Sequence, residues 1–364
     1  MKRSIHFYSI GMLYIVFLLT FAITAGVAQG DCAAGEWLID GACSTADAEL
    51  SNGWHTITTG GETRCAHDTD YRIWVRPGNE HVVLYFQGGG GCWNEDTCRQ
   101  GSTFYKQSAG LNEAAGYRNG IFDFDNPDNP FSDSTFVFAP SCTGDVYMGS
   151  DVSSYSDDVV VHHHGFDNLM AVVNFTIDYA PEPESVFVAG CSAGSVGSAI
   201  AVPFIIDAYP DTRVTQLGDS LGTIFDTATD LSSLWGVPDF YTEALSEFAP
   251  DLSEFSTTDY YIAMAQAYPN YTFAQFNYQF DRVQQRYFAA GVDDPADLIA
   301  EALDTSLNAI SEEVSNFRYF LADDSRHCIL PAANFYQLAT DDVSALDWIT
   351  DIAQNDTVSS VIDN

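Results

Sequence analysis

Residues 190–194 constrain this chain more than any other stretch, because they turn a strand directly into a helix. The apolar run 186–189 enters Gly-Cys-Ser-Ala-Gly, and small and apolar residues continue to Ala208. A reversal this tight forces the central residue into strained backbone dihedrals, and the flanking glycines remove the Cβ atoms that would clash. The pattern predicts that Ser192 is exposed at a helix N-terminus, where the Ala193 N–H can face a developing oxyanion.

Strands and helices alternate around this turn. The alternation predicts an α/β fold with a mostly parallel sheet, helices on both faces and a site at the C-terminal strand ends. Around Pro77-Gly78-Asn79, residues 72–75 and 81–86 are typical of a β-hairpin. Further strands are predicted at 135–139, 159–161, 185–189, 214–217, 273–278 and 317–321, and helices at 166–179, 195–208, 295–314 and 343–352.

The N-terminus has the organisation of a secretory signal peptide. Basic Met1-Lys2-Arg3 precedes the apolar run 10–27, and small residues end at Ala28, where we place the cleavage. A retained anchor is the alternative, because this run is long enough to span a bilayer. We expect a secreted, periplasmic or extracellular monomer with no membrane segment after cleavage. The predicted units are a signal peptide (1–28), an N-terminal extension (29–64) and one catalytic domain (65–364) in which the aromatic and acidic stretch 235–271 forms a small cap.

The charge of the chain excludes polyanionic partners. Residues 1–28 hold two basic residues and no acidic one, so 11 basic residues face 51 acidic ones in the remainder, a formal net charge of −40. Such a surface repels nucleic acid and anionic membranes. We interpret it as a solvated coat suited to high salinity. A calcium-binding coat is the alternative, although the sequence has no D-x-[DN]-x-[DN]-G loop.

A serine nucleophile needs a histidine to accept its proton and an acid to orient that histidine. After a strand-to-helix turn of this kind, the order along the chain is serine, acid, histidine. His327 is the one histidine that follows Ser192, and it comes directly after a predicted strand. Asp281 is the preferred acid and Asp219 the alternative, since each follows the end of a predicted strand. Asp323 and Asp324 stay open but are not preferred, because they are too close in sequence to His327.

A second glycine-rich block ends the predicted strand 81–86. Residues 88–91 are four glycines, which let backbone N–H groups approach a small oxygen closely. Ester hydrolases need such a second N–H for the oxyanion. A flexible turn is the alternative, whereas a phosphate loop is excluded because no Gly-Lys-Ser/Thr follows. The two glycine features together favour hydrolysis of an ester.

In combination these blocks resemble the pectin acetylesterase/Notum family of secreted carboxylesterases. The resemblance runs from about Cys65 to Trp348 in the right order. Each block alone is unspecific, and together they are specific. The blocks are Gly-Gly-Gly-Gly-Cys-Trp at 88–93 with Cys98, Gly-Cys-Ser-Ala-Gly at 190–194, Gly-Asp-Ser at 218–220, Phe-Asp at 280–281 with Gln284, and His-Cys at 327–328.

The resemblance implies an α/β-hydrolase-like fold and a defined set of site residues. It implies that Ser192, Asp281 and His327 form a triad. It further implies an oxyanion hole made by backbone amides and two disulfides. The amides are those of Gly89, Gly90 and Ala193, and the disulfides are Cys65–Cys142 and Cys92–Cys98.

The chain also departs from the family pattern. Gly90 stands where many members carry tryptophan, Ser195 where a third glycine is common, and Phe280 where tyrosine usually precedes the acid. These departures leave the chemistry intact and leave the substrate open.

The remaining cysteines and histidines have weaker signals. All eight cysteines follow the signal peptide, as expected in an oxidising compartment. Cys32 and Cys43 bracket a short turn, as Cys92 and Cys98 do, and are candidates for a local bridge. Cys191 and Cys328 either bridge or lie buried separately. At most two histidines of the run 162–164 could share one ion, because neighbouring strand residues point to opposite faces, and we expect no metal and no cofactor.

The sequence thus predicts a secreted serine carboxylesterase that hydrolyses acyl esters through an acyl-enzyme. Its expected substrate is an acylated carbohydrate or a small ester, with acetyl as the acyl group. One alternative is a lipid, polyester or protein-acyl ester hydrolase with a longer acyl pocket. The other is a non-catalytic extracellular binding protein, against which the order of the triad argues.

Overall fold

The computed structural model describes residues 32–220, 222, 231–249, 251–252, 256–289, 291–354 and 358–362. The predicted signal peptide lies outside these residues. None of the helices in the described ranges is both long and apolar enough to cross a membrane.

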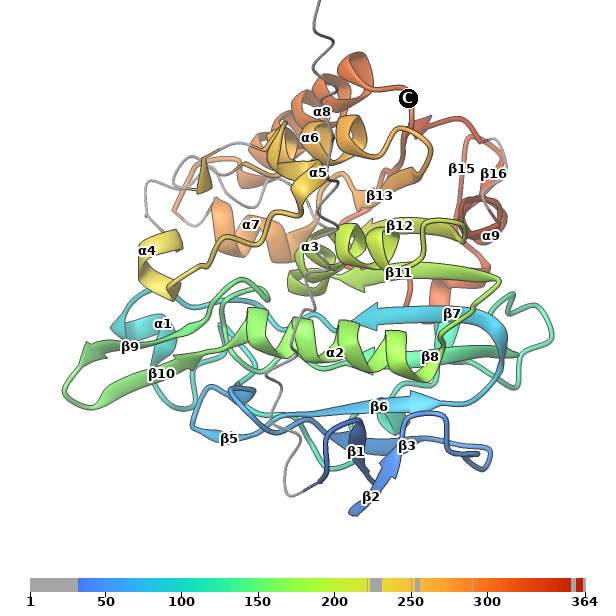
Figure 1. Cartoon of the computed structure of the whole chain (residues 1–364). Coiled ribbons are helices and arrows are strands. Elements are labelled where there is room, and N and C mark those ends of the chain that lie inside the picture. Colours follow the sequence, from blue (N-terminus) through green and yellow to red (C-terminus); the bar gives the residue numbers. More distant parts are fainter. Residues whose placement is uncertain are drawn as a thin grey trace, which may run out of the picture.

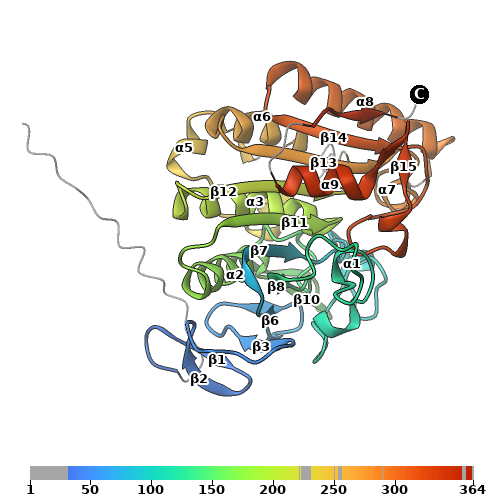
Figure 2. The ribbon, with the colours of Figure 1, turned by 90° about the vertical axis from the view of Figure 1, so that its right-hand side faces the viewer.

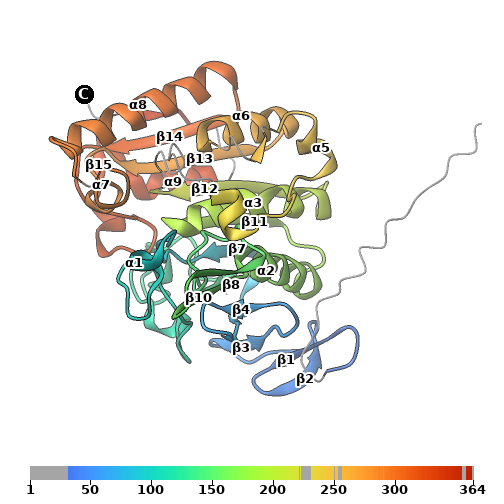
Figure 3. The same cartoon turned by 90° about the vertical axis from the view of Figure 1, so that its left-hand side faces the viewer.

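One large sheet forms the centre of the molecule (Figures 1 and 3). Its strands within the described residues are β1 (Glu36–Ile39), β2 (Ala42–Thr45), β3 (His55–Thr58), β6 (Arg72–Arg76), β7 (Asn79–Phe86), β8 (Ser134–Ala139), β11 (Ser185–Cys191), β12 (Arg213–Asp219), β13 (Thr272–Tyr278), β14 (Phe317–Ala322) and β17 (Val361–Ile362). Their order is β17-β14-β13-β12-β11-β7-β8-β6-β3-β1-β2. Pairs from β17 to β8 are parallel and pairs from β8 to β2 are antiparallel, so the predicted mostly parallel α/β fold is confirmed.

The predicted hairpin around Gly78 is wrong. Strand β8 lies between β6 and β7, antiparallel to the first and parallel to the second. Every residue of β8 is buried, as expected for a strand inside a sheet that is covered on both faces. The turn after β6 therefore opens around β8. There the Gly78 N–H donates to Thr135 Oγ1 at 3.0 Å, and the Asn79 N–H donates to the Asp133 carbonyl at 2.8 Å.

Helices cover both faces of the sheet, as predicted (Figures 1 and 2). Alternate residues of β7 belong to two separate apolar cores, one under each face. Helix α3 packs against β7, β11 and β12, which its small residues permit. The first core is formed with α2 (Gly165–Tyr179), α3 (Ala193–Ala208), α6 (Thr257–Ala267) and α8 (Pro295–Glu313), and the second with α9 (Ala345–Ala353).

The N-terminal strands β1 to β3 continue the main sheet at its antiparallel edge. Trp37 of β1 fastens them to α2, because its Nε1 donates to Asp178 Oδ2 at 3.0 Å and its ring packs on Phe175. Within the described part of the chain, three short two-stranded sheets lie outside the main one. They are β4 (Arg64–Cys65) with β5 (Thr69–Asp70), β9 (Asp151–Ser156) with β10 (Val159–His163), and β15 (Ala339–Thr340) with β16 (Val343–Ser344).

The remaining short α-helices among the described residues are α1 (Glu95–Cys98), α4 (Leu231–Trp235), α5 (Glu243–Ser246) and α7 (Arg282–Phe288). The stretch expected to form a cap begins with the last residue of α4 and includes α5 and α6. Within it, Tyr260 of α6 donates its hydroxyl to the Ala199 carbonyl of α3 at 3.2 Å, so α6 packs on the body of the fold. The cap itself stays a prediction.

Candidate active site

Ser192 lies at the tight turn between β11 and α3. Its φ of 56° and ψ of −124° are strained for a residue with a side chain. The glycines on either side are required by contact: a Cβ on Gly190 would lie 2.0 Å from the Gly194 carbonyl oxygen, and a Cβ on Gly194 would lie 2.0 Å from that of Phe86. The turn therefore has the geometry expected for a nucleophile presented at a helix N-terminus.

His327 and Asp281 are brought together from two neighbouring strand ends. Asp281 follows β13 and is wholly buried, and His327 follows β14. His327 Nδ1 lies 2.6 Å from Asp281 Oδ2. Because an ionised carboxylate only accepts hydrogen bonds, Nδ1 carries the proton in this contact and Nε2 is the ring nitrogen left for another partner.

The carboxylate of Asp281 is held in place by the start of α7. It accepts hydrogen bonds from the Val283 N–H at 2.8 Å and the Gln284 N–H at 3.1 Å, so Asp281 is the N-cap of this helix. The Gln284 side chain adds a third bond, with Nε2 3.2 Å from Asp281 Oδ2. Fixed in this way, the carboxylate can orient the imidazole of His327.

Ser192 and His327 line the same cavity, which has a volume of about 210 Å³. Gly90, Gly91 and Ala193 also border it. The rest of its lining is mainly apolar and aromatic, and α7 supplies a large share. The apolar and aromatic residues are Trp93, Val146, Leu231, Trp235, Val283, Tyr287 and Phe288.

The alternative acid, Asp219, has different partners. It is wholly buried at the end of β12, and its carboxylate accepts hydrogen bonds from the backbone N–H groups of Ile329 at 2.9 Å and Leu330 at 2.8 Å. Burial raises the pKa of Asp219 to about 7, and these hydrogen bonds only partly oppose the rise. Asp281, not Asp219, thus contacts the His327 ring.

Residues 72–287 match the pectinacetylesterase family. The chain belongs to that family. The resemblance seen in the sequence is thereby confirmed, and the chain is a carboxylic ester hydrolase by family. The matched range includes Ser192 and Asp281 and ends before His327.

The fold is similar to the solved structure of the Wnt deacylase Notum from Drosophila. The TM-score is 0.59 at 15% sequence identity, over 84% of this chain and 95% of that one. At this identity the likeness shows the fold alone. No curated protein matches the sequence.

The glycine block of this pectinacetylesterase family member is shaped by close contacts. Gly90 has a φ of +69°, and a Cβ there would lie 2.0 Å from the Phe104 carbonyl oxygen. Gly89 lies against Ser141, and its carbonyl accepts the Lys106 N–H at 2.8 Å. Of the three residues expected to form the oxyanion hole, Gly90 and Ala193 border the cavity and Gly89 does not. Its neighbour in the block, Gly91, borders the cavity instead.

A partly buried ion pair supports the strand end that leads into this block. Lys106 Nζ lies 2.9 Å from Gln87 Oε1 and 2.6 Å from Glu113 Oε1, and Gln87 Nε2 lies 2.7 Å from the same carboxylate oxygen. Burial raises the pKa of Glu113, but the hydrogen bonds from Lys106 and Gln87 outweigh it and hold the pKa below its ordinary value. Sequence reasoning missed this support, because Lys106 and Glu113 lie in a loop without a motif.

Val146 enters the cavity from a strained loop that the sequence also did not reveal. Its φ is 49°, an unusual value for a β-branched residue. The loop is held by Asp145, whose buried carboxylate accepts the Gly165 N–H at 2.7 Å and the Thr143 hydroxyl at 2.6 Å. The structure around Asp145 thus fixes one wall of the cavity.

All eight cysteines of this family member form disulfides. Cys65–Cys142 and Cys92–Cys98 are the two implied by the resemblance, and Cys32–Cys43 is the local bridge suggested by spacing. The pairing left open by the sequence is a fourth bridge, Cys191–Cys328, which joins the neighbours of Ser192 and His327.

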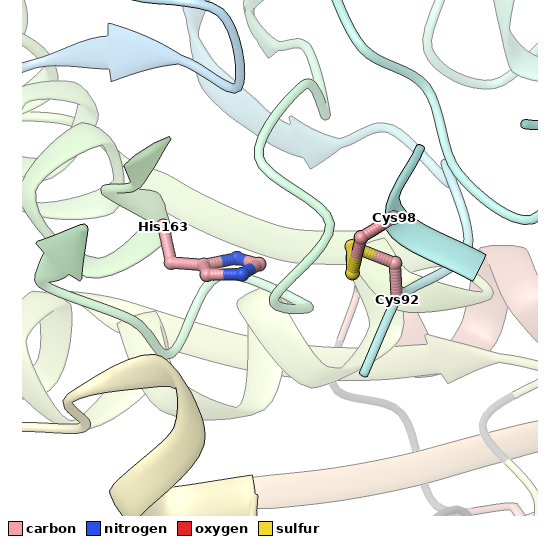
Figure 4. A group of neighbouring side chains, drawn as sticks. All are labelled: Cys92, Cys98 and His163. Atoms are coloured by element: carbon pink, nitrogen blue, oxygen red, sulfur yellow. A yellow bond between two sulfur atoms is a disulfide. The ribbon is translucent and has the colours of Figure 1, made fainter. Parts of the chain in front are cut away.

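The histidine run gives a buried structural residue. His163 is completely buried, with Nε2 2.8 Å from the Tyr155 hydroxyl and Nδ1 2.8 Å from the Thr143 carbonyl. Burial lowers its pKa to about 3. Figure 4 shows its ring beside the Cys92–Cys98 bridge, whose sulfur atoms are bonded to each other and are not thiolates that could bind a metal. We keep the prediction that this group holds no metal.

Proposed function

We propose that this chain is a secreted serine carboxylesterase that removes acyl groups, chiefly acetyl, from an acylated carbohydrate. One observation carries the proposal: a strained serine and a histidine bonded to a buried carboxylate border one cavity. Such a combination is the arrangement that nucleophilic acyl transfer needs.

In the proposed reaction, Ser192 Oγ attacks the ester carbonyl carbon while His327 Nε2 accepts its proton. Asp281 holds the Nδ1–H and stabilises the charged imidazole. The oxyanion faces backbone N–H groups of Ala193 and of the glycine block, with Gly89 and Gly90 as the expected donors. Collapse expels the alcohol, to which His327 returns the proton. Water, deprotonated by His327, then hydrolyses the acyl-enzyme and releases the acid.

The apolar lining of the cavity favours a second candidate within the same reaction. The rings of Trp93 and Phe288 are part of a lining that is mainly apolar. A longer acyl chain, from a lipid, a polyester or an acylated protein, would bury more of it. The kcat/KM values for a series of p-nitrophenyl esters from acetyl to palmitoyl separate the two. A maximum at acetyl supports the first candidate, and a maximum at longer chains supports the second.

The alcohol side of the substrate is constrained by charge. With 51 acidic residues in the chain, a polyanionic glycan such as unmodified pectin is repelled at low salt. A neutral acetylated polysaccharide meets no such barrier. Activity on neutral and anionic acetylated polysaccharides, each measured at low and high salt, tests this preference.

The proposal as a whole depends on Ser192. Ser192→Ala should lose at least about 10³-fold in kcat for p-nitrophenyl acetate, because the attacking oxygen is removed. Ser185→Ala is a matched control, since Ser185 begins the strand that leads to Ser192. A fluorophosphonate should label the wild type and the control but not Ser192→Ala. Full activity in Ser192→Ala contradicts the proposal, and a wild type that is neither labelled nor active supports a binding protein instead.

A further inference from the structure

Asp219 contacts both halves of the site. Its backbone carbonyl accepts the Ser192 N–H at 2.8 Å. Its carboxylate accepts the N–H groups of Ile329 and Leu330, which follow His327 in the chain. One residue at the end of β12 therefore connects the turn that carries the serine to the loop that carries the histidine.

Two further links cross between the same segments. Ser220 Oγ accepts the Cys328 N–H at 2.9 Å. The Cys191–Cys328 disulfide joins residues 137 positions apart in the chain, each next to a member of the proposed triad. The two loops are thus fastened by hydrogen bonds and by a covalent bond.

The backbone at this junction is strained on all three of its segments. Ser192, Ser220 and Cys328 have φ values of 56°, 59° and 58°, in the left-handed region that favours glycine. Residues with side chains keep such conformations only where the surrounding contacts determine them. The contacts that do so here are the Asp219 hydrogen bonds and the disulfide.

We propose that Asp219, together with the Cys191–Cys328 bridge, is a positioning device that sets the distance and orientation between Ser192 Oγ and His327 Nε2. This inference rests on the proposed function and assigns Asp219 a role in it. Asp219 acts through the backbone on both sides and touches neither the substrate nor the imidazole. Its removal should therefore reduce turnover more than substrate binding.

The test is the exchange Asp219→Asn, which keeps the size of the side chain and points an N–H₂ donor at backbone donors. We expect kcat for p-nitrophenyl acetate to fall about 10- to 100-fold, the loss that a misplacement of about 1 Å causes, with KM nearly unchanged. The matched control is Asn168→Asp. Asn168 is also buried and also connects distant segments, through the Arg64 N–H and carbonyl. This control should lower Tm and leave kcat unchanged.

A second pair of variants keeps the test decisive if Asp219→Asn does not fold. Replacing Cys191 and Cys328 by serine should lower kcat and the rate of fluorophosphonate labelling. Replacing Cys32 and Cys43, a bridge at the antiparallel edge of the sheet that adjoins neither Ser192 nor His327, should lower Tm alone. All rates are measured well below the Tm of each variant.

The possible outcomes distinguish a failure of the positioning role from a failure of the proposed esterase function. Wild-type kcat and labelling rate in both Asp219→Asn and the Cys191/Cys328 variant overturn the positioning role while the esterase stands. A loss in Asp219→Asn as large as that in Asp281→Asn overturns it too, because Asp219 is then the catalytic acid. Retention of activity in Ser192→Ala overturns the function itself.

Discussion

Two parts of this molecule place two cysteines and a histidine next to each other, with very different results. Cys191, Cys328 and His327 form one group, and Cys92, Cys98 and His163 the other; in each, the sulfur and ring nitrogen atoms lie within 4.8 Å of one another. Both cysteine pairs are disulfides. The groups differ in the partners and surroundings of the histidine.

His327 borders a cavity and is bonded to a carboxylate, whereas His163 is enclosed and bonded to a hydroxyl and a carbonyl. An acidic partner stabilises a protonated imidazole, and a buried neutral surrounding opposes it. Burial accordingly lowers the pKa of His163 to about 3, so this ring stays neutral. Partners and access, rather than residue type, therefore decide which histidine can move a proton.

The largest expected effect comes from exchanging each histidine for glutamine. His327→Gln removes the proposed base, and kcat for p-nitrophenyl acetate should fall by about 10⁴-fold or more. His163→Gln should leave kcat within about twofold of the wild type, because the ring only fills space in the interior and hydrogen-bonds to Tyr155 and Thr143. A large kcat loss in His163→Gln, measured below its Tm, would remove the distinction between the two groups.

Substitutions of the two histidines' partners should differ nearly as much in their effect on kcat. Asp281→Asn leaves His327 without its carboxylate and favours the wrong tautomer, so kcat should fall by about 10⁴-fold. Tyr155→Phe removes the hydroxyl bonded to His163 and should leave kcat unchanged. Steady-state kinetics of both variants provide the measurement. A kcat of Asp281→Asn that stays near the wild-type value contradicts the proposed acid.

Much of this contrast was predictable from the sequence. His327 could be chosen because it is the one histidine after Ser192. Asp281 could be chosen because it follows the predicted strand 273–278, which precedes the strand that leads to His327. The strand ends of a parallel sheet meet at one edge, so the order of elements was enough to predict that these residues converge.

The contacts that hold the site together were not predictable in the same way. Asp219 acts through backbone N–H groups of residues 329 and 330, and main-chain donors leave no pattern in the side chains. Helix α7 was missed, although Asp281 before an amphipathic heptad is an N-cap signal that could have indicated it. The hairpin failed because local turn signals do not show that a distant strand, β8, inserts between two neighbours.

A smaller effect separates the two histidines in stability. The pKa of His163 is lowered in the folded chain, so the unfolded chain binds a proton that the folded one does not between pH 6.5 and about pH 3. Keeping His163 neutral therefore adds nothing against folding above pH 6.5, but it lowers the free energy of unfolding as the pH falls below that value. The loss is on the order of 3 kcal/mol by pH 4. The difference in unfolding free energy between the wild type and His163→Gln should therefore shrink as the pH is lowered. Urea titrations at pH 7 and pH 4 measure it, and a difference that stays constant contradicts a neutral, buried His163.

The smallest expected effect is that of a chelator, and it tests whether either group is a metal site at all. Cysteine binds zinc as a thiolate, and the sulfur atoms of Cys92, Cys98, Cys191 and Cys328 are engaged in disulfides. A single histidine in each group then offers too few ligands for a structural or catalytic zinc ion. EDTA should leave both kcat and Tm of the intact protein unchanged, and added zinc should raise neither. The contrary result is a loss of activity in EDTA that zinc restores and that is absent in His327→Gln or His163→Gln. One of the two groups would then be a metal centre, and its cysteines would be thiolate ligands instead of a disulfide.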